Sequence, residues 1–372
     1  MKVDKIKYSN FRNIRDAEIS FSPGVNVLWG MNAQGKSNIL EGVYYFARGR
    51  SFRGVRDRDL VMFGESLAQF SLDFERGESS SHVRLSAQIP ASGKKRLMRN
   101  GAPLRGASEM IGAFRAVLFC PAHLSIVNGG PAERRSFLDI AIAQNSPDYV
   151  YYLSNYRRFL AERNALLKRA ASGVRVSSTE WETYAAQLAR VASAIYTLRY
   201  EYCSALTSDV ADCFVEMTGH RETPSIRYLS HFDGAENSDE SYEEVLFRKL
   251  TTNIERESIV GSTLWGPHKD DISILLNGRE ARLYASQGQQ RSLALSMKLA
   301  EGDFSRRASG EYPVFLLDDV FSELDESRRR FITEKLRGRQ LIVTSCEGTI
   351  IDSAETNYIE VVNGEPRRSS AL

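Results

Sequence analysis

The sequence predicts an α/β fold that combines a nucleotide-binding unit with an antiparallel β part and a mainly helical lobe. Three observations support this prediction. The stretch from Gly30 to Ser37 reads GMNAQGKS and matches the P-loop pattern G-x-x-x-x-G-K-[ST] at every fixed position. Polar and apolar residues alternate over much of residues 68–120, which is typical of strands. Over residues 131–217 the apolar residues instead recur at three-and-four spacing, which is typical of helices.

The P-loop pattern lies in the context that phosphate binding requires. Residues 25–29 predict a short buried strand before it, and residues 37–44 predict a helix with an apolar face after it. The glycines let the backbone wrap a phosphate, and the helix N-terminus attracts anions. Lys36 is expected to reach the β- and γ-phosphates, and the Ser37 hydroxyl to ligate Mg²⁺. The expected nucleotide-binding residues are Gly30, Met31, Asn32, Ala33, Gln34, Gly35, Lys36, Ser37 and Asn38.

An apolar stretch, residues 312–317, ends in two carboxylates, Asp318 and Asp319. This is the Walker B pattern. Asp318 is expected at the strand end beside the P-loop, where it would bind Mg²⁺ directly or through water. Asp319 is expected to orient the attacking water or act as general base. Taken alone, the pattern also fits a surface turn capped by two acids, but its pairing with a P-loop favours catalysis.

A second phosphate-binding helix start is predicted between the P-loop and Walker B. Residues 286–291 read SQGQQR and lead into a helix. Ser286, Gly288 and Gln289 at such a helix start favour a phosphate. A single nucleotide-binding unit needs only one helix N-terminus for one γ-phosphate. We therefore expect this second helix start to cap a nucleotide held by a second copy. Asp325, in the loop after Walker B, is expected at the same interface.

The composition is that of an ordinary globular chain. Its 372 residues are 42% hydrophobic and 26% charged, with a net charge of +2, so a DNA-binding role would require basic residues gathered on one face. Four scattered cysteines without a C-x-x-C pair argue against a zinc site or a disulfide framework and fit a reducing cytosol. No signal peptide or membrane span is expected, so the predicted location is the cytoplasm.

Two basic segments each allow two interpretations. Residues 48–58 hold five arginines, which fits either a solvated loop or a segment near phosphates or DNA. Residues 94–99 are basic and precede an Asn-Gly turn, which fits either a lysine-guarded edge strand or a DNA contact.

The helical region predicts an arm. Two long helices, broken near residues 171–173, would form an antiparallel hairpin, and a further helix is expected over residues 241–255. The arm's basic residues fit a solvated face or a phosphate-binding one; they are Arg157, Arg158, Arg163, Lys168 and Arg169. We therefore expect residues 1–120 and 258–372 to form the ATPase lobe and residues 121–257 to form the mainly helical arm lobe.

The ordered set of motifs resembles the ABC-type ATPase head of transporters and chromosome-maintenance proteins. More closely, the chain resembles the RecF family, and the resemblance runs nearly end to end. The matching stretches are residues 10–13 (NFRN), 37–41 (SNILE), 49–53 (GRSFR), 118–121 (LFCP), 130–139 (GPAERRSFLD), 266–271 (GPHKDD) and 286–291 (SQGQQR). Of these, GPAERR and GPHKDD are specific to the family.

The resemblance implies an SMC/Rad50-like head with a helical arm and no long coiled coil. It also implies ATP-dependent homodimerisation, binding of duplex DNA at gaps or junctions, and slow, DNA-stimulated hydrolysis. The same resemblance implies that the protein works with RecO and RecR to load RecA. It also implies a part in SOS induction and a location on the nucleoid. Whether single strands also bind is left open.

The chain departs from the family and class patterns at several positions. Ala33 stands where the family has glycine, and residues 120–123 lack the usual acids, which puts a water- or metal-contacting role of that loop in doubt. Thr344 stands where transporters place a switch histidine, so an imidazole cannot sense the γ-phosphate there. Asp319 replaces the transporter glutamate, and its shorter side chain fits slow turnover.

Two other functions compete with a DNA-binding ATPase switch. The first is a small-molecule P-loop kinase or a transport subunit, against which the SQGQQR helix and the lack of a membrane span argue. The second is a scaffold without hydrolysis, which intact Lys36, Asp318 and Asp319 disfavour.

Overall fold

A computed structural model describes the chain except at residues 78–79, 220–221, 233–239, 348–355 and 369–372. The chain divides into two compact units. The first unit comprises Met1–Leu124, Asp212–Arg221 and Arg291–Leu372, and the second comprises Ser125–Ala211 and Glu222–Gln290.

The first unit holds an antiparallel sheet of six strands in the order β2-β1-β4-β5-β6-β7. The alternation seen in the sequence places one residue of every two in the core, and this predicted β part is confirmed. The Asn-Gly turn after β6 has positive φ at both residues, 51° and 82°, as a two-residue hairpin requires. The strands are β1 (Lys2–Phe11), β2 (Ile14–Ser20), β4 (Leu67–Arg76), β5 (Ser81–Pro90), β6 (Arg96–Arg99) and β7 (Ala102–Leu104).

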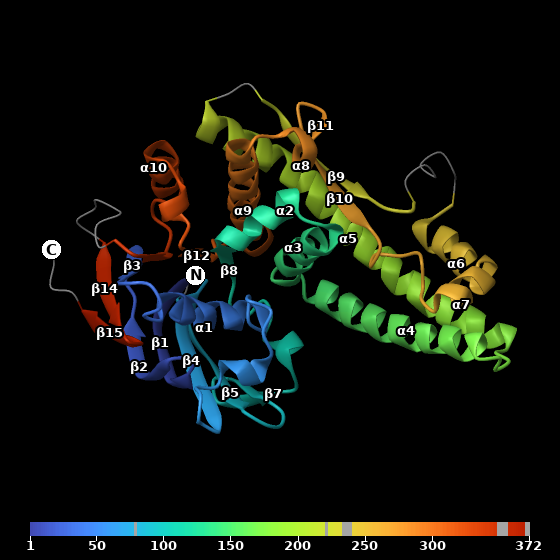
Figure 1. Ribbon diagram of the computed structural model, residues 1–372, viewed down its shortest axis with the longest axis horizontal. Helices are drawn as coiled ribbons and strands as arrows, with labels where there is room; N and C mark the ends of the chain where they lie inside the picture. Colours follow the sequence, from blue (N-terminus) through green and yellow to red (C-terminus); the bar gives the residue numbers. More distant parts are fainter. Residues whose placement is uncertain (78–79, 220–221, 233–239, 348–355, 369–372) are drawn as a thin grey trace. The chain divides into compact units, whose positions relative to one another are not determined.

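The second sheet of this unit carries the nucleotide-binding motifs. Its order is β15-β14-β3-β13-β12-β8, and all neighbours pair in parallel except β14 with β15. Figure 1 shows the red β14 beside the blue β3, although they come from opposite ends of the chain. The strands are β3 (Val25–Trp29), β8 (Ala116–Phe119), β12 (Val314–Asp318), β13 (Leu341–Ser345), β14 (Asn357–Val362) and β15 (Glu365–Arg368).

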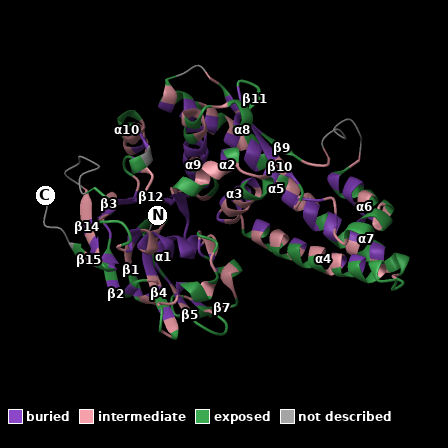
Figure 2. Cartoon of the chain, viewed as in Figure 1, coloured by how far each residue is buried: buried purple, intermediate pink, exposed green. Residues whose placement is uncertain are grey.

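Helix α1 (Lys36–Arg48) contacts strands of both sheets, among them β12, β13 and β4. It is buried almost all round, as the purple colour in Figure 2 shows. Two more helices, α9 (Gln287–Ser309) and α10 (Glu326–Lys335), flank Walker B in sequence. Short 3₁₀ helices cover Asp57–Leu60, Ala107–Glu109, Pro121–Leu124 and Phe321–Glu323.

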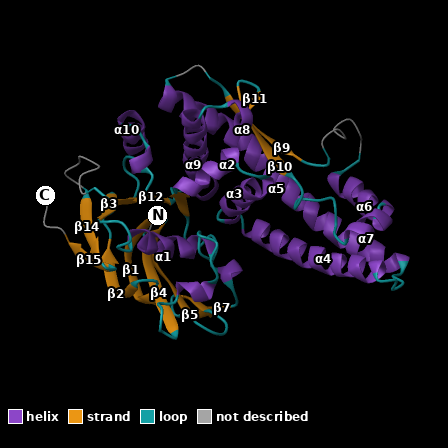
Figure 3. Cartoon of the chain, in the orientation of Figure 1, coloured by secondary structure: helices purple, strands orange, loops and turns teal. Residues whose placement is uncertain are grey.

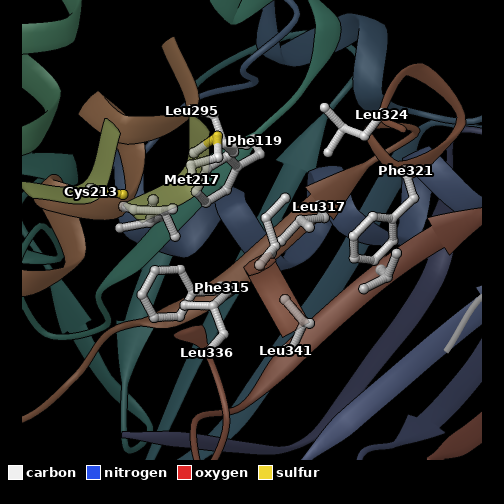
Figure 4. Close-up of a cluster of buried hydrophobic side chains, with 14 of the residues drawn as sticks. Phe119, Cys213, Met217, Leu295, Phe315, Leu317, Phe321, Leu324, Leu336 and Leu341 are labelled. Atoms are coloured by element: carbon white, nitrogen blue, oxygen red, sulfur yellow. The ribbon is translucent and has the colours of Figure 1, made fainter. Parts of the chain in front are cut away.

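An apolar core underlies the parallel sheet. Phe315 and Leu317 of β12 lie in it with Leu341 of β13, and all three are at most 1% exposed (Figure 4). Cys213 and Met217, near the end of a long helix that begins in the second unit, complete the same core. This packing fixes the strand end that carries Asp318.

The second unit is mainly helical (Figure 3). Its long helices α4 and α5 form the predicted hairpin, which closes where Leu166 and Leu167 pack on Trp181. The helices are α2 (Ser125–Asn128), α3 (Pro131–Ala143), α4 (Pro147–Ala171), α5 (Ser178–Thr218), α6 (Tyr242–Thr252), α7 (Ile254–Val260) and α8 (Ala281–Tyr284). A small antiparallel sheet comprises β9 (Pro224–Leu229), β10 (Asp271–Leu276) and β11 (Arg279–Glu280).

Two details differ from the sequence prediction. The helix expected over residues 241–255 is two helices, because Asn253 leaves helical geometry and its side chain binds the carbonyl of Lys249 at 2.9 Å. The second unit differs from the predicted arm lobe, residues 121–257: it extends to Gln290 because β10 pairs with β9, whereas residues 121–124 and Asp212–Arg221 belong to the first unit, in whose core Cys213 and Met217 pack. Among the described residues, no helix combines the length and the apolar character that crossing a membrane requires.

Candidate nucleotide-binding site

The P-loop joins β3 to α1 at the carboxyl edge of the parallel sheet, where open α/β sheets bind their ligands. Gly30 has φ 146° and Gly35 has φ 110°. A Cβ at Gly30 would lie 2.5 Å from the carbonyl oxygen of Val361, so no larger residue fits there. Met31, Asn32 and Ala33 between these glycines are exposed.

Lys36 folds back over the loop. Its Nζ donates to the carbonyl oxygens of Gly30 at 2.6 Å and Met31 at 2.8 Å, and the residue is 5% exposed. The Sγ of Cys346 lies 3.9 Å from the same Nζ and donates to Asn32 Oδ1 at 2.8 Å. The position of Cys346 at the P-loop was not predicted, because nothing in the sequence around it marks a ligand site.

Asp318 ends β12 next to β13, within reach of the P-loop helix. Its carboxylate is hydrogen-bonded to the Ser37 hydroxyl, and Thr344 Oγ1 donates to Asp318 Oδ1 at 2.9 Å. Burial raises the pKa of Asp318, although both hydrogen bonds and the charge of Arg53 oppose that rise. The structure therefore brings together Lys36, Ser37 and Asp318, which lie almost 300 residues apart in sequence.

Ser37 and Asp318 have the chemistry that Mg²⁺ requires. Both present hard oxygen atoms, and Mg²⁺ in phosphate-transfer sites takes one or two protein ligands and completes its shell with phosphates and water. Within the described residues, no group of three or more His, Cys, Asp or Glu side chains could hold a metal. The pair thus fits a metal shared with a nucleotide rather than one bound by protein alone.

Asp319 adopts a left-handed backbone conformation, with φ 58°. Its N–H donates to Thr344 Oγ1 at 2.9 Å, and its carbonyl oxygen accepts from the Ser322 hydroxyl at 2.7 Å. The residue is half-buried. Thr344 is 1% exposed and directed at the two aspartates, so its hydroxyl is occupied within the protein.

A fully buried carboxylate, Glu41, organises the polar surroundings of α1. Arg12 donates to both of its oxygens, at 3.0 and 2.8 Å, and Ser51 Oγ also bonds to it. Arg53 lies 3.9 Å from Glu41 and donates to Asn38 Oδ1 at 2.9 Å. Three of the family-like stretches (NFRN, SNILE and GRSFR) therefore meet around one helix. Within the arginine-rich segment, Arg53 is near enough to act on Asp318.

The SQGQQR stretch begins α9, as predicted, and residues 286–290 of it belong to the second unit. The Gln289 N–H donates to Ser286 Oγ at 3.3 Å, and the Ser286 N–H donates to Gln289 Oε1 at 2.6 Å. This reciprocal cap closes the first turn. Gln289 also donates to Glu222 at 2.5 Å, whereas Ser286 is exposed. That Ser286, Gly288 and Gln289 bind the nucleotide held by another copy stays a prediction.

Asp325 caps α10. Its Oδ1 accepts from the Arg328 N–H at 2.9 Å, and hydrogen bonding to Arg328 lowers the pKa of the carboxyl. Arg328 Nε also donates to Ser292 Oγ on α9 at 3.1 Å, which ties the loop after Walker B to the SQGQQR helix. Asp325 thus has a structural role beside the nucleotide contact predicted for it.

Residues 120–123 carry two titratable side chains that burial keeps in their neutral forms. Burial raises the pKa of Cys120 to about 11 and lowers the pKa of His123 well below its usual value. The Cys120 N–H donates to His123 Nδ1 at 3.3 Å. The loop is therefore held by its own neutral groups.

The two family-specific stretches meet in the second unit. Arg134 of GPAERR pairs with both oxygens of Asp271 of GPHKDD at 2.7 Å, and Arg135 donates to the carbonyl oxygen of Asp270 at 2.8 Å. His268 contacts Tyr156 Oη at 2.5 Å and the Thr263 carbonyl at 3.0 Å. These motifs hold α3, α4 and β10 together.

The basic segments differ in what they offer to a ligand. In the hairpin, Lys95 is anchored by Gly49, Tyr45 and Asp57, while Lys94, Arg96 and Arg99 are exposed. On the arm, Arg163 is fully buried and pairs with Glu257, so it cannot contact phosphates. The other predicted arm cations are exposed: Arg157, Arg158, Lys168 and Arg169.

Comparisons with known proteins give one consistent result. Residues 2–369 match the family described as RecF/RecN/SMC N terminal domain. The DNA replication and repair protein RecF of Desulfitobacterium hafniense is 36% identical over 370 residues, 98% of this chain and 99% of the relative. The corresponding protein of a Thermoanaerobacter species is 34% identical over 365 residues, again 98% and 99% of the two chains.

Solved structures are similar to this chain as well. The structure of the recombination mediator protein RecF-ATP in the RecFOR pathway has a TM-score of 0.91 at 31% identity and covers 99% of this chain and 98% of that one. The Smc head of Pyrococcus furiosus has a TM-score of 0.55 at 16% identity, with 98% and 95% covered, which shows the shared fold.

Fold and site together define an SMC-like P-loop ATPase head with a helical lobe and, in the part of the chain that the structure describes, no long coiled coil, as the family resemblance implied. Within that class, the chain belongs to the family of the DNA replication and repair protein RecF.

Proposed function

We propose that this protein is an ATP-dependent DNA-binding switch, in which ATP joins two copies and slow hydrolysis separates them. The observation that carries the proposal is the convergence of Lys36, Ser37 and Asp318 at one edge of the parallel sheet. The ATP-bound state of the RecF relative supports the choice of nucleotide.

The chain's own residues divide the work at this site. The exposed loop from Met31 to Ala33 would wrap the phosphates, and Lys36 would exchange its carbonyl partners for phosphate oxygens. Ser37 and Asp318 would hold Mg²⁺, which neutralises charge on the phosphates. Asp319 would orient water. Arg53, held by Asn38, would add a positive charge beside them.

The second copy would supply Ser286, Gly288 and Gln289 to the nucleotide. The exposed Ser286 at a capped helix start supports this role. Contacts from the second copy to the bound phosphate would then stabilise the dimer. Loss of this phosphate on hydrolysis would remove those contacts and release the two copies.

DNA is the proposed substrate of the closed dimer, bound through phosphates at gaps or junctions. The names of the relatives support DNA repair, and the exposed cations of the hairpin and the arm are the candidate contacts. The RecFOR pathway named for the solved relative supports RecO and RecR as partners. The proposal also includes loading of RecA, a part in SOS induction and a location on the nucleoid in the cytoplasm.

Sedimentation with and without ATP tests the dimer. We expect ATP-dependent dimers for the wild type but not for Lys36→Arg or Ser286→Arg. Ser154→Arg, which changes an exposed serine on α4, is the matched control and should dimerise normally. Normal dimerisation of Ser286→Arg would exclude the shared site.

Binding of duplex DNA across a salt series then tests the substrate. Phosphate contacts make log K fall with log salt by about 0.9 per contact. Alanine at Lys94, Arg96 and Arg99 should flatten that slope if the hairpin binds DNA. Alanine at Arg157, Lys168 and Arg169 should flatten the slope if the arm binds DNA. Failure of the wild type to bind duplex DNA would favour the kinase or transport alternative.

A further inference from the structure

We propose that Thr344 is the residue that positions both Walker B carboxylates for the hydrolysis proposed above. It lies in β13, at the position where transporters have a switch histidine, and its contact with Walker B was not predicted from the sequence. The inference rests on the proposed ATPase function, and it assigns Thr344 a role through Asp318 and Asp319 rather than on the nucleotide itself.

The pairing of β12 with β13 places Thr344 at this point. The two strands are parallel, and their register sets Thr344 directly opposite Asp318. Thr344 is 1% exposed, so water does not compete for its hydroxyl. A serine or threonine hydroxyl has one hydrogen to donate and lone pairs to accept with. Here it donates to Asp318 Oδ1 and accepts from the Asp319 N–H, each at 2.9 Å.

The donated hydrogen bond fixes the Asp318 carboxylate. Thr344 binds one oxygen, and the Ser37 hydroxyl also bonds to the group. Rotation of the carboxylate would break the Thr344 bond in a buried site, where an unsatisfied polar group is costly. The carboxylate is thereby held in one orientation toward the P-loop helix.

The accepted hydrogen bond fixes the backbone of Asp319. A non-glycine residue with φ 58° is in a sparsely populated conformation, and such strain persists only where the surroundings hold it. Thr344 holds the amide before Asp319, and Ser322 holds the carbonyl after it at 2.7 Å. Together they determine where the Asp319 side chain leaves the backbone.

Two substitutions separate positioning from packing. Thr344→Val keeps the branched shape but removes both hydrogen bonds. Thr344→Ser keeps the hydroxyl but removes a methyl group. If Thr344 only fills space, valine should be the better replacement, whereas a positioning hydroxyl requires serine to be better.

The experiment measures ATP turnover and equilibrium nucleotide binding of the full chain, with Mg²⁺ and with EDTA. We expect Thr344→Val to lower kcat by roughly 10- to 100-fold, as loss of a group behind a metal ligand does, and to weaken the Mg²⁺-dependent part of binding. Binding in EDTA and KM should change by less than about 3-fold, because Lys36 and the loop remain. Thr344→Ser should stay within about 3-fold of the wild type.

Wild-type turnover by Thr344→Val, or equal loss in Thr344→Ser, would overturn the inference. Thermal unfolding checks the fold, and Thr344→Ala serves as a second hydroxyl-free variant if valine is not accommodated. If the wild type binds Mg²⁺ and nucleotide but does not hydrolyse ATP, the proposed switch fails. The Mg²⁺-dependent binding of the variants then still decides the role of Thr344.

Discussion

At the residue scale, Ala33 is the clearest departure of this P-loop from an unstrained one. It adopts φ 65°, a left-handed conformation that glycine reaches without a clash of its Cβ. The sequence predicted only a modest change of the loop at this position. The structure shows that the alanine itself takes the left-handed conformation.

We therefore expect Ala33→Gly to stabilise the protein by up to about 1 kcal/mol, because it removes the left-handed penalty. Denaturant unfolding measures the change. The control is Ala165→Gly, the same exchange at an exposed position inside α4, which should destabilise by about 1 kcal/mol. Effects of equal sign at both positions would contradict the assignment of strain to Ala33.

At the element scale, a buried ion pair joins α4 to α7. Arg163 and Glu257 are both 0% exposed. Arg163 also donates to Thr263 Oγ1 at 2.8 Å and to the Leu250 carbonyl at 2.7 Å, while Glu257 accepts from the Leu264 N–H at 2.7 Å. Sequence pattern grouped Arg163 with the surface cations of the arm. Only the fold shows that it points inward.

Arg163→Met alone should destabilise the second unit by about 3–5 kcal/mol, because it leaves Glu257 buried without its charge partner. The double variant Arg163→Met, Glu257→Leu should recover much of that loss. Fluorescence of Trp181, whose ring lies 6.0 Å from the Arg163 guanidinium, reports unfolding in a chain without the other tryptophans. A double variant as unstable as the single one would show that other interactions dominate.

At the scale of the whole molecule, each unit holds a half-buried histidine that desolvation favours in its neutral form. Burial lowers the pKa of His268 to about 4 in the second unit, and it lowers the pKa of His123 in the first. The unfolded chain takes up a proton near pH 6.5, before the folded chain does. Each histidine therefore adds stability above about pH 6.5, which is lost as the pH falls toward the folded pKa.

We expect the free energy of unfolding to drop between about pH 6.5 and pH 4, with His268 accounting for at most roughly 3 kcal/mol of it. His268→Gln should show a smaller drop over this range, since glutamine does not titrate. Urea unfolding at several pH values measures both proteins. Parallel pH profiles would mean that His268 titrates alike in the two states.

Local pattern predicted much of this protein. The P-loop, Walker B, the hairpin with its Asn-Gly turn after β6 and the break near Ser172 are all encoded within a few residues, because turn chemistry and periodicity act locally. The family resemblance then supplied the fold class, which the comparisons confirm.

Tertiary structure alone decided which distant residues meet. Parallel pairing of β12 with β13 sets Thr344 against Asp318, and packing around α1 joins Arg12 and Ser51 to Glu41. It also buries Arg163 and assigns residues 258–290 to the second unit. Such partners depend on strand order and on contacts between remote segments, which no local pattern records. The sequence by itself therefore determined the kind of site, and the fold determined which residues hold it in place.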